Sequence, residues 1–162
     1  VINLTNKLFD YGIENKFKRK DYIKSMPKET KKVLEDGFDN PIITYKKKTG
    51  DLDIRYCNKK LENQDYKKVL LFRNGYLNPV YDDGNNGVGN NIHHCIVDSE
   101  EEGKKLVELY ESNIYKFMFA ICKYSGFNNG RVMNWLYKDK SIEEIKNILT
   151  KEELELIGKI IS

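Results

Sequence analysis

The stretch that most constrains the fold of this chain is residues 69–97, VLLFRNGYLNPVYDDGNNGVGNNIHHCIV. Two apolar segments flank a long loop built almost entirely from Asn, Asp and Gly. Such a loop has little apolar surface to set against the entropy of ordering it, so we expect fixed ends and outward-facing amides. An Asn side chain carries the donor and acceptor that read the major-groove edge of adenine. A solvated loop without a ligand is the alternative.

Turn residues divide the first two thirds of the chain into short strands. Lys48-Thr49-Gly50-Asp51 lies between two β-rich runs, which is a hairpin pattern. Asn74-Gly75 is a strong two-residue turn, and Pro79 within the strand that follows this turn favours an edge position or a bulge. The expected strands are therefore a hairpin within residues 41–57, a buried strand at Tyr66–Arg73, a returning strand at Tyr76–Tyr81 and a closing strand at Ile92–Val97.

Helical patterns dominate the last third. One short helix is expected earlier, at residues 25–37, with Pro27 in its first turn and Gly37 past its end. Ser99–Glu102 is a capping box that opens a long helix. The later helices are expected at Asn128–Tyr137 and after capping boxes at Ser141–Glu144 and Thr150–Glu153. The apolar residues of the long helix recur at helical spacing and are Leu106, Tyr110, Ile114, Phe117 and Ile121, with Val107 and Met118 beside them, and Gly126 ends it.

These patterns predict one α+β domain, a small antiparallel sheet followed by a helical C-terminal part. Residues 1–97 would form the strand-rich, DNA-facing part and residues 98–162 the helical part. We expect a fragment of a longer protein, because the chain begins at Val1 without a Met. No apolar run approaches the roughly 18 residues of a membrane span. The odd number and wide separation of Cys57, Cys95 and Cys122 favour reduced, buried thiols in a cytoplasmic protein.

Charge is unevenly distributed along the chain. The formal net charge is only +3, but residues 16–68 hold 16 Lys and Arg against 9 Asp and Glu, a balance of +7, which leaves −4 for the rest. A basic half beside an acidic half suggests a protein that presents one face to a polyanion. A Lys-rich coding bias that merely solvates the surface is the alternative.

Catalytic patterns are weak. Asn78-Pro79-Val80-Tyr81 resembles the Asn-Pro-Pro-Tyr loop of adenine-N6 methyltransferases, but the second Pro and a Gly-rich cofactor motif are missing. Asp83 with Glu102-Gly103-Lys104 roughly matches the Asp…Glu-x-Lys pattern of a nuclease site. Glu102 fits better as a helix-capping acid. His93 and His94 would point to opposite faces of a strand, one into the core and one outward, so they cannot share a metal. We expect no catalytic residue, cofactor or metal here.

Binding is the remaining possibility. Lys and Arg suit phosphates, whereas Asn and Arg on a rigid scaffold suit base edges. Arg73 directly precedes a tight turn, so we rank it above any single Asn for base reading. The candidate DNA contacts are Lys46, Lys47, Lys48, Arg55, Lys67, Lys68, Arg73, Asn74, Tyr76, Asn85, Asn86, Asn90 and Asn91.

Residues Lys68 to Leu136 resemble the C-terminal target-recognition domain of adenine-N6 DNA methyltransferases, in particular the TaqI-like and type IIG restriction–modification proteins. Three stretches carry the resemblance: KKVLLFRNGYLNPVYDDGNNGVGNNIHHCIV, SEEEGKKLVELYESNIYKFMFAICKYSGFNNGRVMNWL and, beyond Leu136, LTKEELELIGKI. The resemblance implies sequence-specific binding of double-stranded DNA. It also implies a separate methyltransferase domain in the parent chain, which would bind S-adenosylmethionine and modify the adenine.

Two alternatives stay open. One is a protein–protein interaction module in which the helix Leu106–Ile121 and the terminal helices pack on a partner. The other is an enzyme that uses Asn78 to Tyr81 or, as a small nuclease domain, Asp83, Glu102 and Lys104. Neither alternative involves a membrane.

Overall fold

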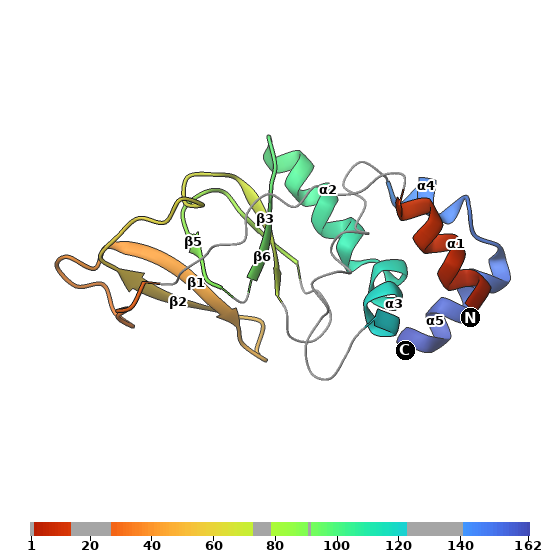
Figure 1. Ribbon diagram of the computed structural model, residues 1–162, viewed down its shortest axis with the longest axis horizontal. Helices are drawn as coiled ribbons and strands as arrows, with labels where there is room; N and C mark the ends of the chain where they lie inside the picture. Colours follow the sequence, from red (N-terminus) through yellow and green to blue (C-terminus); the bar gives the residue numbers. More distant parts are fainter. Residues whose placement is uncertain (1, 14–26, 73–78, 91, 123–140) are drawn as a thin grey trace. The chain divides into compact units, whose positions relative to one another are not determined.

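A computed structural model describes residues 2–13, 27–72, 79–90, 92–122 and 141–162 of the protein (Figure 1). The elements in chain order are α1 (Ile2–Ile13), β1 (Asn40–Lys46), β2 (Leu52–Cys57), β3 (Lys68–Phe72), β4 (Val80–Asp82), β5 (Gly87–Val88), β6 (Ile92–Ile96), α2 (Glu100–Glu111), α3 (Asn113–Cys122), α4 (Ile142–Lys146) and α5 (Lys151–Ile161). The fold class is α+β, as predicted.

The chain divides into two compact units. The strand-rich unit comprises Lys20–Phe72 and Pro79–Lys104, and the helical unit comprises Val1–Arg19, Arg73–Asn78 and Lys105–Ser162. Helix α1, at the start of the sequence, therefore belongs to the same unit as the C-terminal helices, and it has no counterpart among the elements expected from the sequence.

The strand-rich unit contains two three-stranded sheets, ordered β2-β1-β5 and β4-β3-β6. Among the described strands, all pairings are antiparallel except that of β5, which runs parallel to β1. The two sheets share one core. Ile43 and Val88 from the first sheet pack with Leu70, Phe72 and Ile92 from the second, and all five are buried. Burying these apolar side chains is the main favourable contribution to the stability of the unit.

The hairpin expected within residues 41–57 is confirmed as β1 and β2. Its turn closes through the Lys47 N–H, which donates to the Asp51 carbonyl at 2.8 Å, and the Gly50 N–H, which donates to the Lys47 carbonyl at 3.0 Å. Gly50 has φ +94°, a conformation that an L side chain rarely adopts. The glycine therefore fixes the tip of the hairpin.

The buried strand and the closing strand are confirmed as β3 and β6. β3 is the central strand of its sheet and all five of its residues are buried. The returning strand corresponds to the edge strand β4, and the first three residues of the predicted strand, 76–78, lie outside the described residues. Lys68 lies opposite Asp82 and Leu70 opposite Val80. The Asn74-Gly75 turn lies outside the described residues.

The expectation that the Asn/Gly loop is solvated and faces outward is wrong for Gly84 and for residues 87–89. Gly84, Gly87, Val88 and Gly89 are buried, and Gly87 and Val88 form β5 opposite Ile42 and Ile43. Glycine makes this packing possible because it has no side chain. A Cβ at Gly87 would come 3.0 Å from Leu61 Cδ1. The glycines let the backbone join a sheet rather than leave it solvated.

The helix expected at residues 25–37 is wrong over residues 27–37, the part that the structure describes. Lys31 instead bridges to Tyr56 on β2, with N–H to carbonyl bonds of 2.8 and 2.9 Å in the two directions. A turn from Glu35 to Phe38 contains Gly37 at φ +75°. Pairing with the edge of β2 satisfies backbone groups that a helix would have satisfied internally.

The long helix after Ser99 is two helices, α2 and α3, separated at Ser112. The Ser112 hydroxyl accepts from the Tyr115 N–H at 3.4 Å, in the manner of a cap on α3. Most of the predicted apolar face is nevertheless confirmed. Leu106, Tyr110, Ile114, Phe117 and Met118 are buried, whereas Val107 and Ile121 are half-buried.

The two C-terminal capping boxes are confirmed. Ser141 caps α4 and Thr150 caps α5, each with the reciprocal bonds to Glu144 and Glu153. Within the helical unit, α5 is also joined to α1 by an ion pair between Lys7 and Glu153 at 2.9 Å. The helix expected at Asn128–Tyr137 and the stop at Gly126 lie outside the described residues.

Two further expectations concern membranes and thiols. None of the helices in the described ranges is long and apolar enough to cross a membrane. Cys57 and Cys95 are buried and are not in disulfide bonds, as predicted. Nothing is described of the side chain of Cys122.

Candidate nucleic-acid interface

Lys68 is not on the surface. The prediction that it contacts DNA is contradicted by its position on the central strand β3, where its side chain has 0% exposure. Its ammonium lies 2.6 Å from Asp82 Oδ2 and donates to the Tyr66 carbonyl at 3.0 Å. The ammonium is thus used inside the protein, and a phosphate has no access to it.

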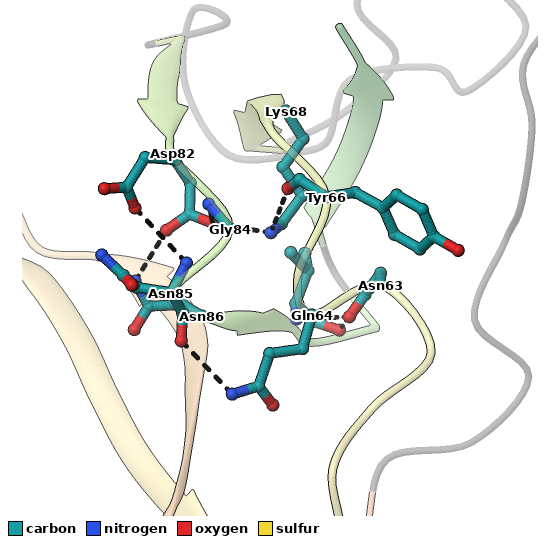
Figure 2. Close-up of polar contacts among 10 residues, drawn as sticks. Asn63, Gln64, Tyr66, Lys68, Asp82, Gly84, Asn85 and Asn86 are labelled. Carbon is teal, nitrogen blue, oxygen red and sulfur yellow. Dashed lines mark hydrogen bonds and ion pairs between the residues drawn. The ribbon is translucent and has the colours of Figure 1, made fainter. Parts of the chain in front are cut away.

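Asp82 connects this buried ion pair to the Asn/Gly loop (Figure 2). Its Oδ2 accepts from the Gly84 N–H at 3.2 Å, and its Oδ1 accepts from Asn86 Nδ2 at 2.6 Å. Both carboxylate oxygens therefore have donors, which a buried charge requires. The predicted DNA contact Asn86 is half-buried and engaged in this network.

A second segment, residues 63–65, holds the loop from its other side (Figure 2). Asn63 forms two bonds with Val88: its Oδ1 accepts from the Val88 N–H at 3.1 Å, and its Nδ2 donates to the Val88 carbonyl at 3.4 Å. The Asp65 N–H donates to the Gly84 carbonyl at 2.9 Å, and Gln64 Nε2 donates to the Asn85 carbonyl at 3.3 Å.

Asn85 is exposed and lies between the buried Gly84 and the half-buried Asn86. Its N–H donates to Asp83 Oδ1 at 3.3 Å and its carbonyl accepts from Gln64. Its side-chain amide makes no hydrogen bond to any residue in the part of the chain that the structure describes. A free amide on a fixed backbone is the arrangement that reading a base edge needs.

The other predicted base-reading residues are less well placed or not described. Asn90 is half-buried, and its Oδ1 is buried without a hydrogen-bond partner in the described ranges. Arg73, Asn74, Tyr76 and Asn91 lie outside the described residues. Among the predicted base readers within those ranges, Asn85 alone combines an exposed side chain with an unused amide.

Half of the predicted lysine and arginine contacts in the described ranges are exposed. Lys47, Lys48 and Lys67 are exposed and Lys46 is half-buried, and within the described ranges none of the four forms an ion pair. Arg55 differs, because its Nε lies 3.3 Å from Asp53 Oδ2. Burial is the largest single effect on the pKa of Asp53 and raises it, but the hydrogen bonds from Thr44 and Arg55 and the charges of Arg55 and Lys47 together lower that pKa below its ordinary value.

Two exposed lysines near the Asn85 loop were not predicted. Lys59 and Lys60 follow β2 and precede the 63–65 segment, and Lys60 forms an ion pair with Asp65. The adjacent Lys59-Lys60 in the sequence was the available signal, but nothing in the sequence alone placed it beside an Asn loop.

Asn85 and the lysine turn, Lys46–Lys48, belong to opposite ends of β1. Gly87, two residues after Asn85, lies opposite Ile42, whereas the lysine turn begins where β1 ends. Because a strand rises about 3.3 Å per residue, the four steps from Ile42 to Lys46 span roughly 13 Å along β1. Lys59, Lys60 and Lys67 are the lysines closer in the fold to the loop, since their segment is bonded to it.

The candidate catalytic residues have structural partners. Glu102 accepts from the Asp98 N–H at 2.7 Å and its own N–H donates to Ser99 Oγ at 3.1 Å, which completes the predicted capping box. Lys104 pairs with Glu100 at 2.6 Å. Within the described ranges, no group of three or more His, Cys, Asp and Glu residues could hold a metal.

Tyr81 and the histidines also lie inward. Tyr81 is half-buried against helix α2, and its hydroxyl has no hydrogen-bond partner in the described part of the chain. Burial and the carboxylates of Glu100 and Asp83 raise the pKa of Tyr81. His93 and His94 are both buried, so the expectation that one faces outward is wrong. Asn78 lies outside the described residues.

The chain matches no family model, and comparison with curated proteins and with solved structures also gives no match.

Proposed function

We propose that this chain binds double-stranded DNA sequence-specifically, as the target-recognition domain of a restriction–modification adenine-N6 methyltransferase. The methyltransferase domain, with its S-adenosylmethionine, would lie elsewhere in the parent chain. The observation that carries the proposal is Asn85, an exposed amide that bonds to none of the described residues and stands on a loop whose backbone is bonded on both sides. Such an amide can form a bidentate pair with adenine N6 and N7.

The exposed lysines support the same proposal. Phosphate contacts supply most of the affinity for DNA and are independent of sequence. Lys46–Lys48 at one end of β1, and Lys59 and Lys67 near the other, form no ion pair in the described ranges, although Lys47 and Lys67 act on the carboxylates of Asp53 and Glu100 at longer range. A duplex that meets both groups lies along the direction of β1, because the two groups are separated along that strand.

A binding-and-sequencing experiment tests the proposal. The 162-residue chain is incubated with a library of random duplexes at low salt, and the bound fraction is sequenced over several rounds. We expect one short motif containing an adenine to be enriched. The Asn85→Ala variant should enrich the same motif with the preference at one base pair relaxed. Absence of binding to any duplex at low salt, or binding without an enriched motif, would contradict the proposal.

An interaction module is the second candidate, and one observation favours it. Val33 and Leu34 are adjacent and 66% and 61% exposed, an unusual concentration of apolar surface on a segment without regular structure. The helix residues that first suggested a partner surface, Leu106, Tyr110 and Phe117, are buried within the chain itself. If no duplex binds, replacing Val33 and Leu34 with Ser and measuring self-association by sedimentation tests this candidate.

A further inference from the structure

We infer that the buried Lys68–Asp82 ion pair is a positioning device for base recognition, because it fixes the loop that presents Asn85. The inference rests on the proposed DNA-binding function and adds the residues that set its specificity. Neither Lys68 nor Asp82 would contact DNA, since their side chains are 0% and 4% exposed.

Asp82 accepts more hydrogen bonds than its ion pair with Lys68 requires. A buried ion pair is costly in desolvation, and an apolar pair of similar volume often serves packing equally well. Here the carboxylate does more than neutralise Lys68, because it also accepts from the Gly84 N–H and from Asn86 Nδ2. These two donors flank Asn85 in the sequence, so the pair holds the loop on both sides of that residue.

The backbone of Gly84 lies close to the backbone of Asp65. Gly84 has φ +109°, and a Cβ on it would come 3.1 Å from the backbone carbon and oxygen of Asp65. A side chain at this position would strain the loop and push it away from residues 63–65. The loop is therefore held between the Asp82 carboxylate and the Asp65 backbone, with little freedom to shift.

The backbone of Asn85 is held in place by hydrogen bonds. Its N–H and carbonyl are both bonded, and only its side chain remains to be ordered on binding. Binding groups held in place before the ligand arrives lose less entropy on association. Discrimination by Asn85 should therefore depend on Asp82 and Gly84, although neither of them reads a base.

Variants that disturb the loop without removing Asn85 test the inference. Lys68→Met/Asp82→Leu replaces the ion pair by an apolar pair and removes the acceptors for Gly84 and Asn86. Gly84→Ala strains the loop without removing a polar group. Gly37→Ala is the matched control, because Gly37 also has positive φ (+75°) but lies in another turn with nothing within 4 Å of its missing Cβ. Each variant of the 162-residue chain is checked for folding by circular dichroism.

Three readouts are then compared: the motif enriched from the random library, the affinity for one fixed duplex without the motif, and amide hydrogen exchange at residues 82–88. We expect both loop variants to relax the same base pair as Asn85→Ala, roughly ten-fold in preference. Their affinity for the fixed duplex should change less than about two-fold, since phosphate contacts supply it. Exchange at residues 82–88 should accelerate. Gly37→Ala should leave motif and exchange unchanged.

The combination with Asn85→Ala is decisive, because residues that act through one another are not additive. Gly84→Ala in the Asn85→Ala background should relax the motif no further. Additive losses, an unchanged motif in a folded loop variant, or equal loss of affinity for all duplexes would overturn the positioning role. Should the ion-pair variant not fold, Gly84→Ala decides alone. If the wild-type chain enriches no motif, the proposed function itself fails, an outcome distinct from a wild-type motif that the loop variants preserve.

Discussion

The ring of Tyr81 lies directly against Gly103 in the first turns of α2. A Cβ built on Gly103 would come 2.4 Å from Tyr81 Cδ2 and 2.6 Å from Cε2, closer than two carbons can approach. The edge strand β4 therefore packs on the helix through a ring that needs a glycine opposite it. Within Glu102-Gly103-Lys104, which spells part of a nuclease motif, the glycine has this packing role.

Gly103→Ala should destabilise the protein by about 1–3 kcal/mol through this overlap, although Ala is the better helix former by about 1 kcal/mol. In a Tyr81→Ala background the same substitution should be neutral or stabilising, because only the helix preference remains. Urea denaturation of the four proteins measures the coupling. Equal effects of Gly103→Ala in both backgrounds would show that the ring and the helix do not press on each other.

Lys68→Met should cost about 3–5 kcal/mol of unfolding free energy, because it leaves the Asp82 carboxylate buried without its cation. Lys67→Met is the matched control on the neighbouring residue. Lys67 is exposed, so its replacement should change stability by no more than about 0.5 kcal/mol. Adding Asp82→Leu to Lys68→Met should restore part of the loss. Similar unfolding midpoints for the two single variants would contradict the buried pair.

Replacing Lys46, Lys47 and Lys48 with Ala should weaken binding to every duplex alike. Removing one ammonium from a phosphate lowers the slope of log affinity against log salt concentration by about 0.9, so the slope should fall by up to about 3. Fluorescence anisotropy at several salt concentrations measures it. Weaker binding confined to the enriched motif would mean that the lysine turn reads bases.

Glu153→Gln should destabilise the helical unit at neutral pH and have no effect in strong acid. The Thr150 backbone N–H and the Lys7 ammonium hold the pKa of Glu153 below its ordinary value of 4.5. A lowered pKa in the folded state means that the charged form stabilises the fold. That stability is complete above pH 4.5 and is lost as the pH falls through the folded-state pKa.

Melting temperatures of the wild type and Glu153→Gln across the acid range measure this dependence. The difference between the two proteins should shrink below pH 4.5 and then vanish. Glu152→Gln is the control, because Glu152 is exposed and takes no part in the cap or the ion pair with Lys7. A difference that persists unchanged in acid would locate the contribution of Glu153 elsewhere.

Phe117→Ala should cost about 3–5 kcal/mol, since Phe117 is 0% exposed in the core of the helical unit. Glu108→Ala, at an exposed position of α2, should stay within about 0.5 kcal/mol of wild type. Urea denaturation compares the two. An unchanged midpoint for Phe117→Ala would be incompatible with its burial.

Elements governed by local chemistry could be predicted from the sequence. Gly50 marked the β1–β2 turn, and Ser141 and Thr150 marked the starts of α4 and α5, because turns and caps depend on neighbouring residues. Elements decided by distant contacts were missed. The pairing of Lys31 with Tyr56 replaced the expected helix, and no local pattern contains that contact.

The candidate site also depends partly on local sequence and partly on distant contacts. Lys67 and Lys68 are adjacent residues of the same type. Lys67 is nevertheless exposed, whereas Lys68 is buried on a central strand. The opposite charge of Asp82 was the available signal, but a two-residue Asn74-Gly75 turn would place Lys68 opposite Tyr81, one residue away from the register observed between β3 and β4. Lys68 and Asp82 are thus an opposite-charge pair across the strands. The anchoring of Asn85 by residues 63–65 had no comparable signal, because those segments are separated by both strands.

The parallel pairing of β5 with β1 also has a consequence for how the chain folds. It joins Gly87 to Ile42 across the whole of β2, β3 and β4, whereas the β1–β2 hairpin joins near neighbours. Contacts between residues far apart in the sequence form slowly, since a long loop must close before they gain anything. We expect the hairpin with its lysine turn to form early and the Asn85 loop to become ordered in one of the last steps. Under the proposed function, a newly made chain would form its phosphate-binding lysine turn before its base-reading loop.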